Sequence, residues 1–220
     1  MKKIILMAVA VILSSAAYAQ NFKHSGSSAS DVTPKGWQIN HEPTGDLNKD
    51  GINDLVIMAT PDSIEHIITR TDGSKYNNNH PVLAIYWGTA EGKFTLYKEY
   101  PTVLEIFDDE LMSMDGLLME NTYEIYITDR GVLRIKDYED QAGSIVITTE
   151  KLYRYQNGDF ELIGEQVDTY DRDTQSAEEV SYNYSTGKVK FTNYYMADDK
   201  DDEVSWGTCP KSPKKKLGQK

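Results

Sequence analysis

Oxygen-bearing side chains recur at regular spacing in one short stretch of the sequence. They occupy positions 1, 3, 5 and 9 of a loop, as Asp46, Asn48, Asp50 and Asp54. Ca²⁺ binds about six to eight oxygen ligands, and a glycine at position 6, here Gly51, permits the sharp turn that directs them inward. The backbone carbonyl of Ile52, at position 7, would supply a further oxygen. The spacing therefore predicts a site for one Ca²⁺ ion.

The residues after the loop distinguish between classes of calcium protein. In an EF-hand, position 12 is a bidentate Glu and a helix follows, whereas here that position is Ile57, within the apolar run 55–59. The pattern DxNxDGxxD, followed directly by an apolar strand, instead resembles the calcium loop of integrin-α and FG-GAP repeat proteins. It occurs once, so a complete propeller, which needs about four blades, is not predicted. The alternative is a turn closed by Asx-type hydrogen bonds without metal.

A second resemblance extends over most of the chain. The segments that carry it are residues 45–51, 82–86, 153–164 and 183–188. In this order they are similar to a family of exported bacterial proteins that carry a single such loop and have no assigned activity. The chain departs from that family around residues 111–121, where relatives have a glycine-rich stretch. The resemblance implies export and one calcium loop, and it implies no catalytic residue.

The N-terminus has the three parts of a secretory signal peptide. Residues 1–3 are basic, residues 4–13 are apolar, and Ala17-Tyr18-Ala19 is a small-x-small cleavage site. We therefore expect residues 1–19 to be removed and the protein to be exported, to the periplasm or the extracellular space. The apolar run is too short to span a bilayer, and no other stretch predicts a transmembrane segment.

The charge of the chain limits its partners. The formal net charge is −12, and loss of Lys2 and Lys3 with the signal peptide lowers it to −14. A strongly acidic surface repels nucleic acid and anionic lipid but suits cation binding. Cys209 is the single cysteine, so the chain has no internal disulfide framework and its stability must come from a packed core.

Alternating apolar and polar residues, interrupted by glycine-containing turns, predict a series of antiparallel hairpins. The paired segments are 82–87 with 93–100, 122–128 with 132–138, 145–156 with 160–167, and 180–184 with 189–192. Asn157-Gly158 is the strongest of the turn signals, because both residues tolerate positive φ. The expected fold is mainly β, an antiparallel meander of sandwich-like or partial-propeller-like sheets with little helix.

Composition divides the mature chain into three parts. Residues 20–35 are rich in Ser, Gly and polar groups, so we expect a disordered leader. Residues 36–195 contain the predicted strands and are expected to form a single β-rich domain. Residues 196–220 form a charged C-terminal tail, in which Trp206 and Leu217 could attach the tail to the domain.

No pattern of a known catalytic class is present in the sequence. The four histidines are not paired with one another or with cysteine at metal-ligand spacing. We therefore expect a calcium-binding module of the cell envelope that acts by binding a glycan, a peptide or another envelope protein, rather than an enzyme. Two alternatives stay open: a hydrolase of the glycosidase type, which needs two positioned carboxylates, and a purely structural envelope protein.

Overall fold

The computed structural model describes most of the chain between residues 21 and 219. The described ranges are 21–64, 67–69, 73, 75–77, 79–101, 103–104, 123–141, 144–195, 201–211 and 215–219. The predicted signal peptide, residues 1–19, and the stretch 111–121 lie outside these ranges. Within them, no helix has the length and apolar character needed to cross a bilayer.

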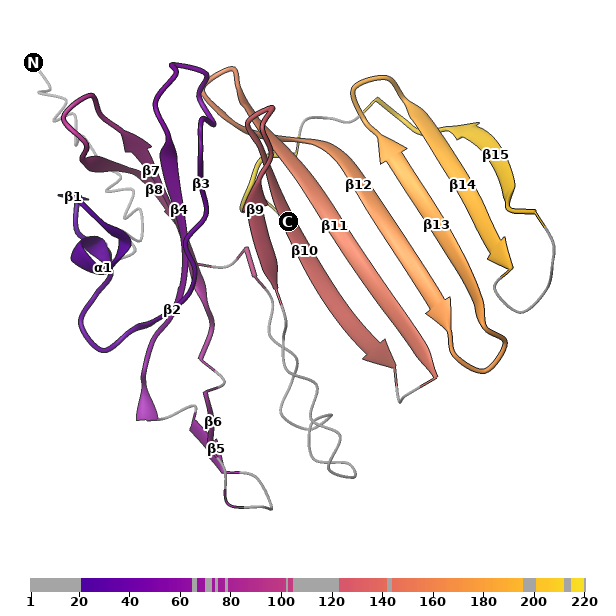
Figure 1. The fold of residues 1–220 in the computed structure, drawn as a ribbon, viewed down its shortest axis with the longest axis horizontal. Coiled ribbons are helices and arrows are strands. Elements are labelled where there is room, and N and C mark those ends of the chain that lie inside the picture. Colours follow the sequence, from indigo (N-terminus) through magenta and orange to yellow (C-terminus); the bar gives the residue numbers. More distant parts are fainter. Residues whose placement is uncertain are drawn as a thin grey trace, which may run out of the picture.

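Antiparallel strands form two large sheets (Figure 1). The N-terminal sheet has the order β1-β8-β7-β4-β2, with β3 paired to β4. Its strands are β1 (Ser25–Gly26), β2 (Gln38–His41), β3 (Thr44–Gly45), β4 (Asp54–Thr60), β7 (Val82–Gly88) and β8 (Phe94–Tyr100). The C-terminal sheet is a meander in which strands β9 to β15 pair in chain order. Its strands are β9 (Glu124–Ile127), β10 (Val132–Gln141), β11 (Ile145–Gln156), β12 (Asp159–Asp171), β13 (Ser176–Asn183), β14 (Lys188–Tyr195) and β15 (Glu203–Thr208).

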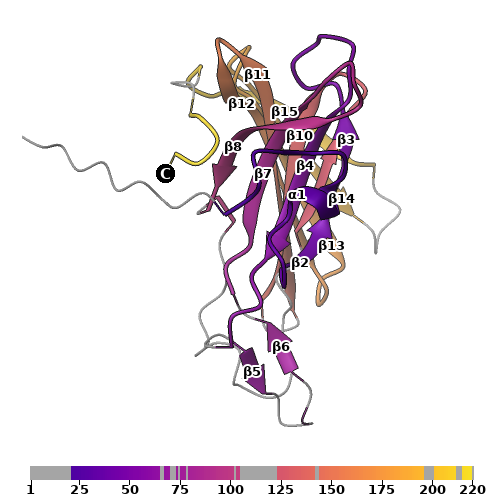
Figure 2. The same ribbon diagram turned by 90° about the vertical axis from the view of Figure 1, so that its left-hand side faces the viewer.

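Two small elements complete the described fold. Strands β5 (Ile67–Thr69) and β6 (Lys75–Asn77) pair with each other and extend from one end of the molecule (Figure 2). Helix α1 (Ala29–Val32) is a single turn, and its N-cap is Ser28, whose side chain accepts a hydrogen bond from Asp31 N. The mainly β fold with antiparallel hairpins and little helix, predicted from strand and turn patterns, is therefore confirmed.

Both faces of the N-terminal sheet are buried. Successive residues of β4 point to opposite faces, so Val56 and Met58 enter one core while Leu55 and Ile57 enter another. The first core, which we call the main core, lies between this sheet and strands β9 to β12; its largest contributions from the C-terminal sheet include Leu133, Tyr153 and Phe160. Burial on both faces explains why residues 55–59 of β4 are continuously apolar rather than alternating.

The second core corrects the prediction of a disordered leader at residues 20–35. The described residues 21–35 contain β1 and α1, and they cover the far face of the N-terminal sheet with Phe22, Ala29 and Val32. Phe22 N donates to Glu99 Oε1 over 2.9 Å, and Tyr86 Oη donates to Lys23 O over 2.9 Å. The segment is polar on average, so its composition does not reveal these few apolar residues. They become ordered because they bury an otherwise exposed apolar sheet face.

The C-terminal tail is likewise part of the fold. Strand β15 pairs with β14, and Lys216 pairs with Glu161 of β12. Leu217 is buried in the main core, as its apolar character predicts, whereas Trp206 is 66% exposed and does not attach the tail. The β-rich fold therefore extends beyond the predicted boundaries 36–195 at both ends.

Candidate metal centre

The predicted calcium loop connects β3 to β4. Gly45 pairs with Asp54 across this hairpin, so residues 46–53 form the connection itself. Leu47 is buried in the main core and anchors the loop to the body of the protein. Gly51 has a φ of 87°, as the sharp turn requires, and Lys49 also adopts a left-handed conformation with a φ of 68°. The structure therefore places the predicted glycine at the bend.

Asp46 closes the first half of the loop. Its Oδ1 accepts hydrogen bonds from Lys49 N over 2.7 Å and from Asp50 N over 3.2 Å. Its Oδ2 accepts from Gly51 N over 3.1 Å. These bonds hold the backbone around the carboxylate, so the partly exposed side chain is directed into the turn.

Asn48 and Asp50 continue the same pattern. Asn48 Oδ1 accepts from Asp50 N over 3.0 Å, and Asp50 Oδ1 accepts from Ile52 N over 2.8 Å. The two side chains also meet, because Asn48 Nδ2 donates to Asp50 Oδ2 over 3.0 Å. Such bonds between a side chain and the backbone two residues later define successive Asx turns, which is the arrangement expected of the loop without metal.

Asp54 lies beneath the loop at the start of β4 and has 0% of its surface exposed. Its Oδ2 accepts from Leu47 N over 2.8 Å and from Asn48 N over 3.3 Å. Its Oδ1 accepts from Gly88 N, at the end of β7, over 2.9 Å. One carboxylate therefore ties both ends of the loop to the neighbouring strand, and it faces backbone donors rather than a second acid.

Burial raises the pKa of the Asp54 carboxyl above its ordinary value. The hydrogen bonds from Gly88, Leu47 and Asn48 oppose this rise in pKa because they favour the carboxylate, and the charge of Asp50 adds to it. A cation beside Asp54 would act in the opposite direction and stabilise the ionised form. The loop thus holds a buried negative charge that a metal ion would compensate.

Counting lone pairs identifies the oxygens that can still bind an ion, since each carboxylate or amide oxygen has two. Backbone donors fill both lone pairs of Asp46 Oδ1 and of Asp54 Oδ2. One hydrogen bond each reaches Asp46 Oδ2, Asn48 Oδ1 and Asp54 Oδ1, which keep one lone pair. Both oxygens of Asp50 also accept one bond each. All four predicted side-chain ligands therefore retain acceptor capacity.

Three glycines bring the rest of the protein close to the loop. A Cβ on Gly131, in the β9–β10 turn, would lie 2.3 Å from Asp46 O, and one on Gly88 would lie 2.1 Å from Asn53 O. A Cβ on Gly45 would lie 2.6 Å from Ile127 Cγ2 of β9. These contacts place the loop at the junction of the two sheets. The sequence marks Gly88 and Gly131 as turn residues, but nothing in it associates them with the loop.

The predicted ligands form a mixed set. In the described part of the chain, no group of three or more His, Cys, Asp or Glu side chains is arranged to hold a metal ion by itself. The set predicted from the loop also contains the amide of Asn48 and the backbone carbonyl of Ile52. Oxygen donors of these kinds are typical of Ca²⁺ sites.

A comparison of the chain with protein family models, curated proteins and solved structures finds no match. The chemistry of the loop is therefore inferred from its own residues, hydrogen bonds and surroundings.

Proposed function

We propose that this protein is an exported calcium-binding β-protein that acts as a binding or interaction module of the cell envelope, in the periplasm or outside the cell. One observation supports calcium binding above the others. All four side-chain ligands keep a lone pair that can bind an ion, although backbone N–H groups already close the loop. The one-ion ligand set is Asp46, Asn48, Asp50 and Asp54 through side chains, and Ile52 through its carbonyl.

Calcium in this loop would act on the junction of the two sheets. Asp46 and Asp50 belong to the loop, Asp54 belongs to β4, and Gly131 holds the β9–β10 turn against the loop backbone. Three carboxylates in one short stretch repel each other, and a divalent cation converts that repulsion into coordination. Binding would therefore stabilise the folded state by mass action.

Export and envelope location are proposed from the signal peptide pattern of residues 1–19. The acidic charge excludes nucleic acid as the natural partner and leaves protein or glycan. The resemblance of the loop to integrin-α and FG-GAP repeats supports the calcium assignment, and we assign no catalytic residue.

Thermal unfolding with and without calcium tests the metal site. Extracellular calcium modules have Kd values of roughly 10⁻⁴ to 10⁻³ M. Millimolar calcium should then stabilise the protein by about 0.4 to 1.4 kcal/mol, which raises the melting temperature by a few degrees. Mg²⁺ should stabilise it less, because Mg²⁺ requires a tighter octahedral shell.

Two loop variants make the test specific. Asp50→Ala removes an exposed ligand and should abolish the calcium response, whereas Asn53→Ala, an exposed loop residue outside the ligand set, should retain it. If calorimetry detects no calcium binding and the melting temperature is indifferent to both calcium and chelator, the loop is an Asx turn without metal.

A further inference from the structure

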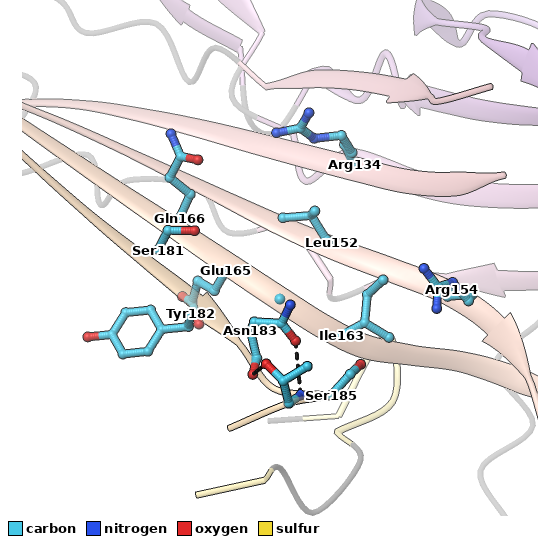
Figure 3. Close-up of a pocket in the computed structure, with 12 residues that line it drawn as sticks. Arg134, Leu152, Arg154, Ile163, Glu165, Gln166, Ser181, Tyr182, Asn183 and Ser185 are labelled. Carbon is cyan, nitrogen blue, oxygen red and sulfur yellow. Dashed lines mark hydrogen bonds between the residues drawn. The ribbon is translucent and has the colours of Figure 1, made fainter. Parts of the chain in front are cut away.

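A hollow of about 320 Å³, lined by both polar and apolar side chains (Figure 3), lies on the C-terminal sheet, on the face opposite the main core. We call this face the outer face; it carries Arg134, Leu152, Arg154, Gln166, Ser181 and Asn183. Strand register shows that these residues share one face, because Arg134 pairs with Leu152, and Gln166 pairs with Ser181. A volume of this size falls at the small end of the range of natural ligand sites, about 300 to 1,000 Å³.

Gly164 of β12 forms the floor of the hollow. It pairs with Leu152 on one side and with Asn183 on the other. A Cβ at this position would lie 3.0 Å from Tyr182 O and 4.0 Å from Leu152 Cβ. A glycine inside a long strand weakens the strand and commonly marks a place where another group approaches the backbone closely. Here it leaves the centre of the face open between side chains on three strands.

The two arginines of the hollow have different surroundings. Arg134 forms an ion pair with Glu150, and its guanidinium carbon lies 5.1 Å from the centre of the Tyr126 ring. Tyr126 Oη also donates to Glu150. Arg154 lies two residues beyond Leu152 along β11 and therefore points to the same outer face. It is exposed and has no ion-pair or hydrogen-bond partner among the described residues. One guanidinium is therefore fixed and the other is available.

The acids near the hollow are already engaged. Glu150 is bound to Arg134, Glu179 lies 3.5 Å from Lys190 Nζ, and Asp168 accepts from Gln166 Nε2. Glu165 also lines the hollow, but its carboxylate accepts from Tyr184 Oη over 2.7 Å. Glu161, the cross-strand neighbour of Arg154, is buried, and its carboxylate accepts from Gln156 Nε2 and from Asn157 Nδ2. On a chain with a net charge of −12, the hollow thus presents an exposed guanidinium whose neighbouring carboxylates have other hydrogen-bond or ion-pair partners.

Neutral donors and acceptors surround this positive charge. Asn183 Oδ1 accepts from Thr186 N over 3.0 Å, which leaves the Asn183 amide N–H groups as donors (Figure 3). Ser181 and Ser185 add hydroxyl groups, while Leu152 and Ile163 add apolar surface. A ligand matched to this lining carries an anionic group for the arginine, several hydroxyl groups, and a small apolar patch.

We propose that the hollow binds a carboxylate-bearing saccharide, with the uronate carboxylate on Arg154 and the ring hydroxyls on Asn183, Ser181 and Ser185. The planar guanidinium can donate two parallel hydrogen bonds to a carboxylate, and the sugar ring can approach the backbone where Gly164 has no side chain. The proposal rests on the interaction module proposed above and gives that module a ligand class. No residue of the hollow requires the calcium ion for this binding.

An exposed tryptophan extends the proposed site. The register runs from Gln166 to Ser181, Lys190 and then Trp206, one residue on each of four adjacent strands and all on the outer face. Neighbouring strands are about 4.8 Å apart, so Trp206 lies roughly 10 Å from Ser181. An exposed indole face can stack on the apolar face of a sugar ring. The ligand is therefore an acidic oligosaccharide, with one unit in the hollow and a further unit on Trp206.

Calorimetric titration of the full mature protein with trigalacturonate tests this proposal. Three reference ligands separate its parts: the methyl ester of the same trisaccharide, which lacks charge; monomeric galacturonate; and acetate, which is an isolated carboxylate. Each titration is run in calcium and in chelator, because uronates also bind calcium. We expect one site for trigalacturonate under both conditions, with weaker binding of all three reference ligands.

Four variants locate the site. Arg154→Ala should weaken trigalacturonate binding by about tenfold or more, since a charge-assisted pair of hydrogen bonds is lost. Lys151→Ala removes the same charge from an exposed neighbour on the opposite face and should leave binding unchanged. Trp206→Ala should weaken the trisaccharide but not the monosaccharide. Asp50→Ala should keep saccharide binding while losing the calcium response, so this proposal and the calcium proposal can fail separately.

Any one of the following outcomes would overturn the saccharide proposal. The first is equal binding of trigalacturonate and its methyl ester, which would remove the role of the carboxylate. The second is equal binding of acetate and trigalacturonate, which would leave an anion site without sugar recognition. The third is wild-type affinity in Arg154→Ala, or no binding of trigalacturonate by the wild-type protein at millimolar concentration.

Discussion

Asp54 combines two tasks in the candidate metal centre. Toward the chain, it accepts hydrogen bonds from three backbone N–H groups, of which that of Leu47 is buried and those of Asn48 and Gly88 are partly buried. Toward the proposed ion, it offers the remaining lone pair of Oδ1. Asp50, in contrast, is exposed, and its bonds stay within the loop. In the absence of calcium, the two acids should therefore contribute differently to the free energy of unfolding.

Replacing each acid by alanine should separate these tasks. Asp54→Ala leaves one buried and two partly buried donors without their acceptor, at about 1 kcal/mol for each lost hydrogen bond, so we expect a loss of roughly 2 to 3 kcal/mol in the free energy of unfolding, even with chelator. Asp50→Ala should cost less than about 1 kcal/mol under the same conditions. Urea denaturation in chelator measures both. Equal losses for the two variants would contradict the structural role assigned to Asp54.

The sequence identified the residues of the loop but not how deeply each would lie. Spacing alone selects Asp46, Asn48, Asp50 and Asp54, because the loop pattern is local and depends on positions a few residues apart. The donor from Gly88 comes from a strand 34 residues away and depends on the register between β4 and β7. Long-range partners of this kind leave no local pattern, so neither the complete burial of Asp54 nor its bond to β7 could be predicted.

At the scale of elements, the β9–β10 turn and the candidate calcium loop fit together only because one residue lacks a side chain. Gly131 has a φ of 64° and lies against Asp46 O and the end of the Lys49 side chain. Gly92, in the β7–β8 turn, has a similar φ of 72° but no neighbour within 4 Å of an added Cβ among the described residues. A comparison of the two glycines therefore separates the cost of a positive φ from the cost of contact with a neighbouring segment.

Gly131→Ala should be more destabilising than Gly92→Ala. Both variants bear the cost of a positive φ, roughly 1 kcal/mol, but only Gly131→Ala must also move the loop away from the turn. We expect an additional loss of about 1 kcal/mol or more and a weaker calcium response in Gly131→Ala alone. Urea denaturation and calcium-dependent melting of the two variants provide the measurement. Identical behaviour would mean that the turn and the loop are mechanically independent.

The hairpins were predictable and the N-terminal element was not, for one physical reason. Turns such as Asn157-Gly158 encode their geometry locally, since Asn157 has a φ of 55° and Gly158 one of 81°. Phe22 and Val32, however, are ordered by the sheet face that they cover, and their polar neighbours mask them in any local average. The outer-face hollow was also missed, because its residues come from four strands, β10 to β13, and from the β13–β14 turn.

For the molecule as a whole, tyrosine burial determines behaviour at high pH. Burial raises the pKa of Tyr153 to about 12, with the charge of Glu165 as a smaller cause. Burial similarly raises the pKa of Tyr86 and of Tyr100. These phenols keep their protons in the folded protein at pH values where an unfolded chain, with a tyrosine pKa of about 10, has begun to lose them.

The free energy of unfolding should therefore fall as the pH rises from about 10 to about 12. In this window the folded state binds more protons than the unfolded state, so the stability that is fully present below pH 10 is progressively lost. Urea midpoints at several pH values, with absorbance near 295 nm to follow tyrosinate, measure the effect. Tyr153→Phe should make the decline shallower, and an unchanged slope in this variant would contradict the assignment.

The meander of the C-terminal sheet has a consequence for local opening. Among the described strands, β15 pairs in the sheet with β14 alone, and β14 is joined in turn to β13, while the main core begins at β12. The outer strands can therefore detach one after another without breaking any pairing in the N-terminal sheet, at a lower free energy than global unfolding. Amide hydrogens should exchange fastest in β15 and slowest in β4. A ligand that lies across β12 to β15 would slow amide exchange in the outer strands and reduce this difference between strands. Its binding would therefore be detected in the exchange rates before it was detected in the melting temperature.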